Sequence, residues 1–261
     1  MKNYKSGSLW VRLAQILFFG VVTAWIMIGS HQGDTGEADN LKNRIEMAYT
    51  SAEAAEDDTD SVADYDADND AENDAEGDIE IAFTFDDGPH PVWTQKLLDG
   101  LKKRGIRATF FVIGKSAEEH PELIKQMLED GNQVGNHTYS HIQLTACSRN
   151  SALEEIQRTQ DIIYRAAGFC PEYIRPPFGS WNDTLQEETS LETVLWDVDP
   201  YDWKVQDTDA IVRSILKQTK DGSIILLHDV YETSVDAALK VADIFLERGY
   251  RFCTVEEIMI E

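Results

Sequence analysis

A regular alternation of strand-like and helix-like segments from residue 78 onward is the feature that most constrains the fold of this chain. Short apolar runs predict strands at 78–88, 108–114, 132–138, 173–179, 193–199, 223–229 and 251–255. Apolar residues recur at helical spacing over 93–104, 121–130, 148–167, 208–220 and 234–248. Repeated strand-then-helix units predict parallel strands, either closed into a barrel or open with helices on both faces.

The N-terminal segment, residues 1–30, is predicted to insert into a membrane. Its run from Leu13 to Gly29 has no charged side chain, and residues 9–12 extend it to the roughly 20 residues that a bilayer-spanning helix needs. Cations on its N-terminal side favour a cytoplasmic N-terminus. We therefore expect a short cytoplasmic tail and a single transmembrane anchor, with a cleaved signal peptide as the alternative. Both interpretations put the remaining chain outside the cytoplasm, held at the cell membrane or, after cleavage, secreted.

Residues 31–78 are predicted to form a disordered acidic linker. Residues 31–80 contain 18 of the 48 Asp and Glu residues of the chain, against Lys42 and Arg44 alone. Large apolar side chains are scarce there, so the segment cannot bury enough surface to offset its ordering entropy. We expect a hydrated spacer between the membrane and a domain at 79–261. Recruitment of partners by the acidic segment is the alternative.

The charge of the predicted domain excludes one class of partner. Residues 81–261 contain 30 acids and 18 bases, a balance of −12, and the whole chain has a formal charge of −25. Nucleic acid would need a basic face for its phosphates. We therefore expect no nucleic-acid partner.

The three cysteines, Cys147, Cys170 and Cys253, show neither a CxxC pair nor the spacing of a zinc site. We expect them to be ordinary small apolar side chains. A Cys170–Cys253 or a Cys147–Cys170 disulfide is the alternative, because the domain is predicted to lie outside the cytoplasm.

Polar side chains gather at the C-terminal ends of the predicted strands. In parallel α/β folds, this is the end of the sheet where active sites collect. Six residues hold such positions: Asp86, Asp87, His137, Arg175, Asp199 and His228. The sequence therefore predicts an active site at this edge.

Two histidines and one aspartate form a candidate metal site. His137 and His141 are four residues apart, so a helical turn after the third strand would put both imidazoles on one face. Two unrelated surface histidines are the alternative. Asp87 is the candidate third ligand, and an Asp with two His leaves positions open for water and substrate.

The adjacent carboxylates of Asp86 and Asp87 end the first predicted strand, before Gly88 and Pro89. Two like charges this close are costly unless a cation or a proton separates their roles. A metal ion on one and general-base duty for the other would resolve the conflict. A structural Asp-Gly turn is the alternative.

Three further motifs follow later strands. In RPPFG, Arg175 could pair with a carboxylate, and the backbone N–H groups after Pro177 could donate to an oxyanion. In LLHD, His228 suits protonation of a leaving amine near neutral pH. DPYDW offers acids and aromatic faces, and either Trp203 or Trp181 could stack on a sugar. Structural roles (a salt bridge, a rim histidine, core aromatics) are the alternatives for each motif alone.

Taken together, TFDDGP, HTYSH, RPPFG, DPYDW and LLHD resemble the five motifs of the polysaccharide deacetylase family, whose NodB homology domain defines carbohydrate esterase family 4. The likeness spans about residues 79–255. Within the family, the chain is similar to peptidoglycan N-acetylglucosamine deacetylases. It implies a distorted (β/α) barrel of seven or eight mainly parallel strands. It also implies one divalent metal ion, with zinc expected and cobalt, nickel or another ion as alternatives.

The resemblance also assigns roles to residues. It implies metal ligation by Asp87, His137 and His141. It implies catalytic roles for Asp86 as general base, Arg175 as its orienting partner, the Phe178 N–H as an oxyanion donor, His228 as general acid, and Asp202 as the partner of His228. Asp199 is the other candidate for that last role. The resemblance further implies that Trp203 and Leu226 line the groove and the acetyl pocket.

The expected activity is removal of N-acetyl groups from a cell-wall glycan, most simply from N-acetylglucosamine of peptidoglycan, with release of acetate. Chitin oligomers, other exopolysaccharides and acetylated xylan are alternative substrates for the same chemistry. A glycan-binding module without catalysis is the alternative of a different class. The expected partners are therefore the glycan and, through residues 1–30, a membrane.

Overall fold

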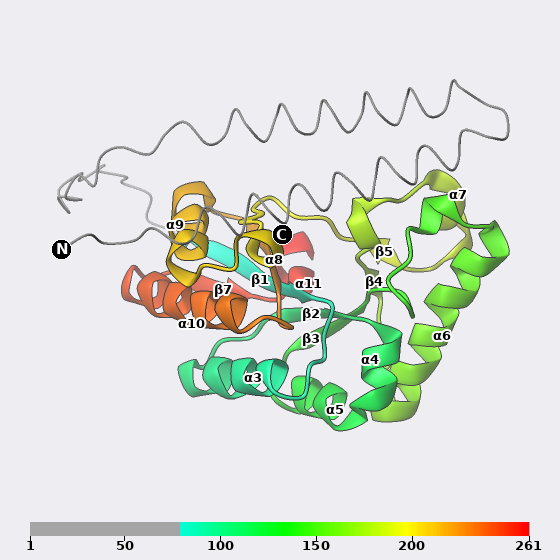
Figure 1. Cartoon of the computed structure of the whole chain (residues 1–261), viewed down its shortest axis with the longest axis horizontal. Coiled ribbons are helices and arrows are strands. Elements are labelled where there is room, and N and C mark those ends of the chain that lie inside the picture. The colour runs from blue at the N-terminus through cyan, green and yellow to red at the C-terminus, as the bar shows by residue number, and fades with distance from the viewer. Residues whose placement is uncertain (1–78, 261) are drawn as a thin grey trace, which may run out of the picture. The chain divides into compact units, whose positions relative to one another are not determined.

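The computed structural model describes residues 79–260 (Figure 1). This part of the chain contains seven strands: β1 Glu80–Asp86, β2 Thr109–Val112, β3 Gln133–Asn136, β4 Tyr173–Ile174, β5 Glu192–Thr193, β6 Ser223–His228 and β7 Arg251–Cys253. Its α-helices are α3 Trp93–Arg104, α4 Gly114–Glu119, α5 Pro121–Glu129, α6 Arg149–Ala167, α7 Asp183–Glu188, α8 Asp202–Val205, α9 Thr208–Gln218, α10 Glu232–Glu247 and α11 Val255–Ile260. Short 3₁₀ turns occupy Leu144–Ala146 and Pro177–Gly179.

All strand pairs in this part of the chain are parallel, as the strand-then-helix pattern predicts. The strand order is β5-β4-β3-β2-β1-β6, and β7 pairs with the first half of β1. The sheet therefore curves as a half-barrel of parallel strands, which bears out the expected α/β class. Because the strands are parallel, their C-terminal ends meet at one edge.

Two predicted strands are shorter than expected. The strand predicted at 193–199 is reduced to β5 and an isolated bridge between Val198 and Ile225. Both Asp197 and Val198 donate their N–H groups to Ile224, and the Asp197 carboxylate accepts the N–H of Ile224, a pattern typical of a bulge. The strand predicted at 173–179 ends at Ile174, because the following Pro176 and Pro177 cannot donate to a ladder.

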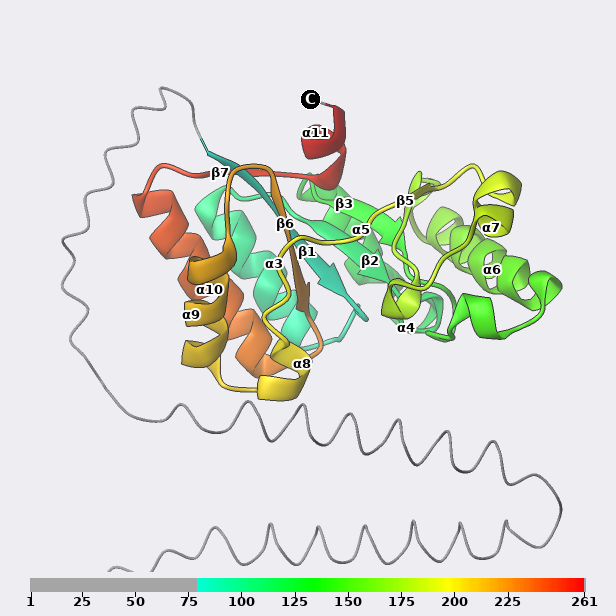
Figure 2. The same ribbon diagram turned by 90° about the horizontal axis from the view of Figure 1, so that it is seen from above.

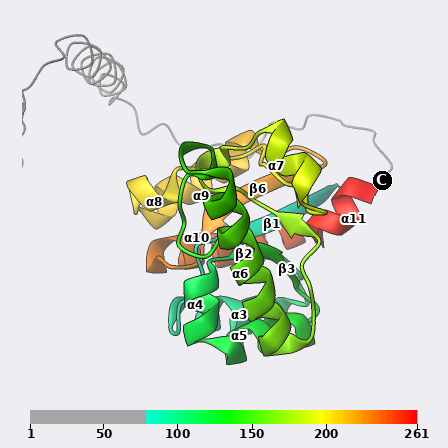
Figure 3. The same ribbon diagram turned by 90° about the vertical axis from the view of Figure 1, so that its right-hand side faces the viewer.

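Helices flank the sheet in two groups. Figure 2 shows α3, α9 and α10 beside β1 and β6, and α4, α6 and α7 beyond the other edge. In Figure 3, α6 lies in front, next to α4 and α5. The main core joins the first group to the sheet: Phe83, Phe85, Leu97, Leu101, Phe110, Ile225 and Phe245 are all buried. Burial of each such side chain contributes about 1.5–3 kcal/mol.

The N-terminal end of the strands is closed by apolar packing. Ala82, Phe111, Tyr173, Val194 and Val255 form a separate buried cluster that extends from α11 toward Arg175, whose Cζ lies 4.3 Å from the centroid of the Phe111 ring. Val255 begins α11 and donates its N–H to the Thr109 hydroxyl. The opposite, C-terminal end is thus the end left to polar groups.

Two predictions concern the rest of the chain and its cysteines. Within residues 79–260, no helix has the length and apolarity to span a bilayer. The predicted anchor at 13–29 and the linker at 31–78 lie outside the described residues and stay predictions. All three cysteines are free thiols, so neither alternative disulfide is formed.

Candidate active site

Strands β1 and β6 supply one face of the site because they pair in register. Thr84 lies opposite Leu226, and Asp86 lies opposite His228. Alternate residues of a strand point to the same side of the sheet, so these four side chains share one face. Asp86 and His228 are the last residues of their strands, which confirms their predicted positions.

Arg175 lies beneath this face and is completely buried. Its Nη1 donates to the Asp86 carboxylate at 2.9 Å and to the Thr84 hydroxyl at 2.7 Å. Its other nitrogens donate to backbone carbonyls, from Nη2 to Leu195 and from Nε to Val194. Burial lowers the pKa of Arg175, and the charge of Asp86 opposes that shift. The pairing of Arg175 with Asp86 is the one that the family resemblance implies.

Asp87 turns away from the strand and faces two imidazoles. Its φ is 75°, a left-handed conformation that non-glycine residues rarely adopt. Asp87 Oδ1 lies 3.5 Å from Nε2 of His137 and 3.4 Å from Nε2 of His141. Asp86 Oδ2 is 3.7 Å from the same His137 nitrogen. The structure therefore brings both carboxylates and both histidines to one place.

The donor set of Asp87, His137 and His141 fits a divalent cation. One ligand atom from each lies within 4.8 Å of the others. Asp87 Oδ1 is buried and has no hydrogen-bond partner among the described residues. His137 Nδ1 is 2.6 Å from the Arg175 carbonyl, which fixes the proton on Nδ1 and leaves the Nε2 lone pair facing Asp87.

The charge balance favours an ionised Asp87. Burial raises the pKa of this carboxyl, but interactions with the nearby imidazoles of His137, His228 and His141 outweigh burial and lower it. For His141, burial lowers the pKa, against the opposing charge of Asp87. A carboxylate beside neutral imidazoles is the form in which these groups bind metals.

HTYSH is a turn and not the helical turn that the four-residue spacing suggests. Thr138 has a φ of 65° and His141 a φ of 57°, so the chain reverses between the two histidines. The Thr138 N–H donates to the Asn136 side chain, and the His141 N–H donates to the Thr138 hydroxyl. The expectation of a helix was wrong, although both imidazoles still reach Asp87. Asn136 was not singled out in the sequence, since its role depends on this turn.

His228 is paired with Asp202, as the family resemblance implies, and not with the other candidate, Asp199. The His228 Nδ1 lies 2.8 Å from Asp202 Oδ1, and the backbone N–H of His228 donates to Asp202 Oδ2 at 2.8 Å. Asp199 instead accepts the N–H of Tyr201. Burial lowers the pKa of His228, but Asp202, with smaller contributions from Asp86 and Asp87, outweighs burial and raises it to about 9.

The remaining predicted residues occupy different environments. Phe178 has a φ of 62° and is 68% exposed, and its ring centroid lies 4.9 Å from that of His141. Within residues 79–260, no acceptor takes its backbone N–H. Leu226 is buried, whereas Trp203, on α8, is about half exposed. Trp181 packs against a buried apolar cluster, which leaves Trp203 as the better candidate for stacking.

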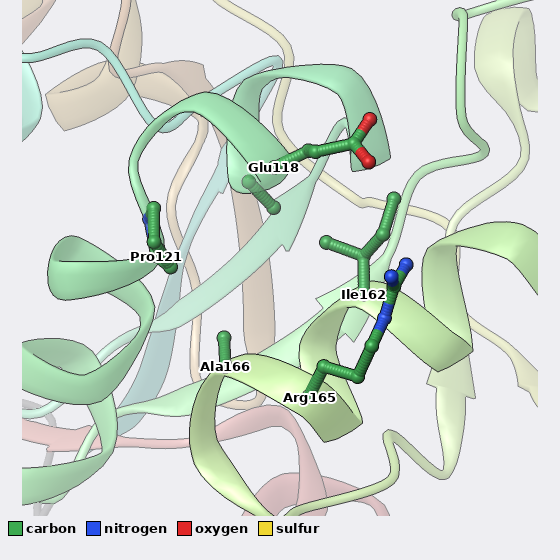
Figure 4. Close-up of a pocket in the computed structure, with 6 residues that line it drawn as sticks. Glu118, Pro121, Ile162, Arg165 and Ala166 are labelled. Carbon is green, nitrogen blue, oxygen red and sulfur yellow. The ribbon is translucent and has the colours of Figure 1, made fainter.

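An open hollow of about 190 Å³ lies between α4 and α6, away from the motif residues (Figure 4). Its lining comprises Ala117, Glu118, Pro121, Ile162, Arg165 and Ala166. None of these was predicted as a site residue. The hollow offers one acid and one base at its rim and no metal-binding group beyond Glu118.

Comparisons with known proteins agree with this geometry. The family model described as polysaccharide deacetylase matches residues 73–194. A peptidoglycan-N-acetylglucosamine deacetylase of Bacillus cereus is 38% identical over 192 residues, which cover 69% of this chain and 87% of that protein. The chain belongs to the polysaccharide deacetylase family.

Two further members of the polysaccharide deacetylase family are informative. The peptidoglycan-N-acetylmuramic acid deacetylase PdaC of Bacillus subtilis is 46% identical over 178 residues, 68% of this chain but only 38% of PdaC. A structure of PdaC gives a TM-score of 0.69 at 44% identity and covers 70% of this chain and 91% of that one. An acetyl xylan esterase of Clostridium thermocellum, solved with a cobalt ion, gives a TM-score of 0.65 at 31% identity, covering 69% and 90%.

Proposed function

We propose that this protein is a metal-dependent hydrolase that removes N-acetyl groups from a cell-wall glycan and releases acetate. The convergence of Asp87, His137 and His141 beside Asp86 carries the proposal. A binding module needs neither a free carboxylate next to a metal site nor a paired imidazole such as His228. The family membership supports the same reaction.

The proposed mechanism assigns a separate task to each residue. A divalent cation held by Asp87, His137 and His141 would polarise the acetyl carbonyl and acidify a water molecule. Asp86, oriented by Arg175, accepts a proton as the water oxygen bonds to the carbonyl carbon. The N–H of Phe178 donates to the oxygen that gains negative charge. His228 then donates a proton to the sugar nitrogen as the C–N bond breaks, leaving acetate and a free amine.

Zinc is the proposed ion. Two imidazole nitrogens and one carboxylate oxygen suit zinc, and three protein ligands leave room for water and substrate. The same donors accept cobalt or nickel, and the cobalt ion in the Clostridium thermocellum relative supports that range.

We propose that peptidoglycan is the substrate. The protein would act on it outside the cytoplasm, held at the membrane by residues 1–30. The named activities of PdaC and of the Bacillus cereus relative support peptidoglycan but differ in the sugar, N-acetylmuramic acid or N-acetylglucosamine. We favour N-acetylglucosamine. Chitin oligomers and acetylated xylan are the competing substrates.

Acetate release tests the proposal. The full chain is incubated with purified peptidoglycan, chitin oligomers and acetylated xylan, and mass spectrometry of the digested wall identifies which sugar has lost its acetyl group. We expect release from peptidoglycan at N-acetylglucosamine, and none from Asp86→Asn. Binding to the wall without acetate release from any substrate would instead support the glycan-binding module.

A further inference from the structure

A glutamate outside all five motifs holds the turn that carries the second imidazole. Glu155 lies on α6, a helix that the sequence predicts from its apolar spacing and to which it assigns no site residue. Its Oε2 accepts the backbone N–H of Ser140 at 2.8 Å, and its Oε1 accepts the Ser140 hydroxyl at 2.8 Å. Ser140 immediately precedes His141, so both oxygens of one carboxylate are committed to the residue next to a metal ligand.

The turn needs such support because its backbone is strained. Thr138 and His141, which flank Tyr139 and Ser140, both have positive φ values. Non-glycine residues persist in this region only when surrounding contacts over-determine it. His141 is also the more exposed of the two imidazoles, with 32% of its side chain accessible against 3% for His137. His141 is therefore the ligand whose position depends most on the turn.

Helix α4 supports the turn from its other side. The N–H of Gly114 donates to the Thr138 carbonyl at 2.8 Å, and the N–H of Lys115 donates to the Tyr139 carbonyl at 3.0 Å. The ring of Tyr139 lies against the guanidinium of Arg158, with 3.4 Å from Cζ to the ring centroid. These contacts fix residues 138 and 139, whereas Glu155 acts on the next residue, directly before the ligand.

We propose that Glu155 is a positioning residue that sets the affinity of the metal site by holding Ser140 and thereby His141. The inference rests on the proposed function, because it takes Asp87, His137 and His141 to be the metal ligands. Loss of the Glu155 carboxylate lets His141 leave the position 3.4 Å from Asp87 Oδ1, so the ion must then order the turn when it binds. Loss of a residue that orients a metal ligand typically weakens metal affinity by roughly 10- to 100-fold.

The test compares Glu155→Ala with Glu154→Ala, using the full chain freed of metal. Glu154 precedes Glu155 on α6 and is exposed. Its side chain makes no hydrogen bond or ion pair with another residue of 79–260, so its loss removes the same charge without touching the turn. Glu155→Gln keeps one acceptor for the Ser140 N–H, and Ser140→Ala removes only the hydroxyl bond. Each protein is titrated with zinc in competition with a chromophoric chelator, and its metal-free thermal unfolding is recorded.

We expect zinc affinity to fall by roughly 10- to 100-fold in Glu155→Ala, with a smaller loss in Glu155→Gln and in Ser140→Ala. Glu154→Ala should match the natural protein, and metal-free unfolding temperatures should agree between the two alanine variants. Equal zinc affinity in Glu155→Ala and Glu154→Ala would overturn the proposal. So would a fall in metal-free stability that accounts for the whole loss, with no recovery in Glu155→Gln.

If Glu155→Ala does not fold, Glu155→Gln and Ser140→Ala decide the question by the same zinc measurement. Acetate release by the natural protein at saturating zinc is recorded separately. Absence of acetate with an intact affinity difference would refute the proposed function and leave the role of Glu155 standing. Acetate release without any affinity difference would do the reverse.

Discussion

The carboxylate of Asp202 binds His228 at two points: Oδ1 accepts a hydrogen bond from the ring Nδ1, and Oδ2 accepts one from the backbone N–H of His228, each at 2.8 Å. Asp202 is fully buried, so its charge acts on His228 with little screening. The arrangement leaves His228 Nε2 as the free nitrogen. It keeps the ring protonated well above neutral pH.

The pH dependence of turnover follows from this pair. His228 has a pKa of about 9, so the proposed acid is charged at neutral pH and loses its proton as the pH rises through that value. We expect kcat/KM to fall on the alkaline side near pH 9. Asp202→Asn removes the charge and should move that fall to lower pH, towards the ordinary value of about 6.5. Asp209→Asn, at an exposed position of α9, is the control. An unmoved alkaline limb in Asp202→Asn would contradict the assignment.

Single substitutions of Asp86 and Asp87 should have different effects on turnover and on zinc affinity. Asp86→Asn removes the proposed base but no ligand, so turnover should fall by about 10²- to 10⁴-fold while zinc affinity is kept. Asp87→Asn removes a charged ligand and should lose zinc at the same concentration. Rates and calorimetric zinc titrations of both variants measure the difference. Unchanged turnover in Asp86→Asn, or equal loss of zinc in both, would refute the division of roles.

The Arg175–Asp86 pair predicts a stability effect. Arg175→Met leaves the buried Asp86 carboxylate without its cation, and breaking one partner of a buried pair typically costs about 3–5 kcal/mol. Urea unfolding should show a loss of this size. Arg165→Met, which removes an exposed arginine from α6, should cost far less. Adding Asp86→Asn to Arg175→Met should recover part of the loss, and full additivity of the two changes would argue against coupling.

Asp229 predicts a stability that depends on pH. Burial raises the pKa of Asp229 to about 7, although a hydrogen bond from Thr94 opposes the shift, and Gly88 packs directly on the carboxylate. The folded state therefore holds a proton that the unfolded chain releases near the ordinary aspartate pKa of 3.8. Between these pH values the contribution of Asp229 to stability falls as the pH rises, by about 1.4 kcal/mol per unit at most.

Asp229→Asn removes this titration and keeps an acceptor for Thr94. Its unfolding free energy relative to the natural protein should rise steadily from pH 5 to pH 7 and level off above. Urea unfolding at several pH values measures the difference. A difference that does not change with pH would show that Asp229 is ionised throughout.

Much of the fold and the composition of the site follow from sequence patterns. Strand-then-helix alternation predicts parallel strands, and parallel strands bring Asp86, His137, Arg175 and His228 to one edge. Four short helices, α4, α7, α8 and α11, were not predicted. Each has six residues or fewer, too short for apolar periodicity to reveal.

The features that the sequence could not predict depend on contacts between distant residues. The four-residue spacing of His137 and His141 suggests a helix, but Asn136, α4 and Glu155 together stabilise a turn with two left-handed residues. Likewise, 193–199 has the composition of a strand, but the Asp197 side chain competes for the N–H of Ile224. A local sequence pattern reveals neither of these contacts with distant residues.

The most direct test of the central claim is acetate release from purified peptidoglycan by the full chain after a chelator has removed its metal. Release is measured before and after one equivalent of zinc is added. The shared site of Asp87, His137 and His141 predicts no release before zinc and full release after it, with no recovery in Asp87→Ala at the same zinc concentration. Full release by the chelated protein, or equal recovery in Asp87→Ala, would contradict the claim.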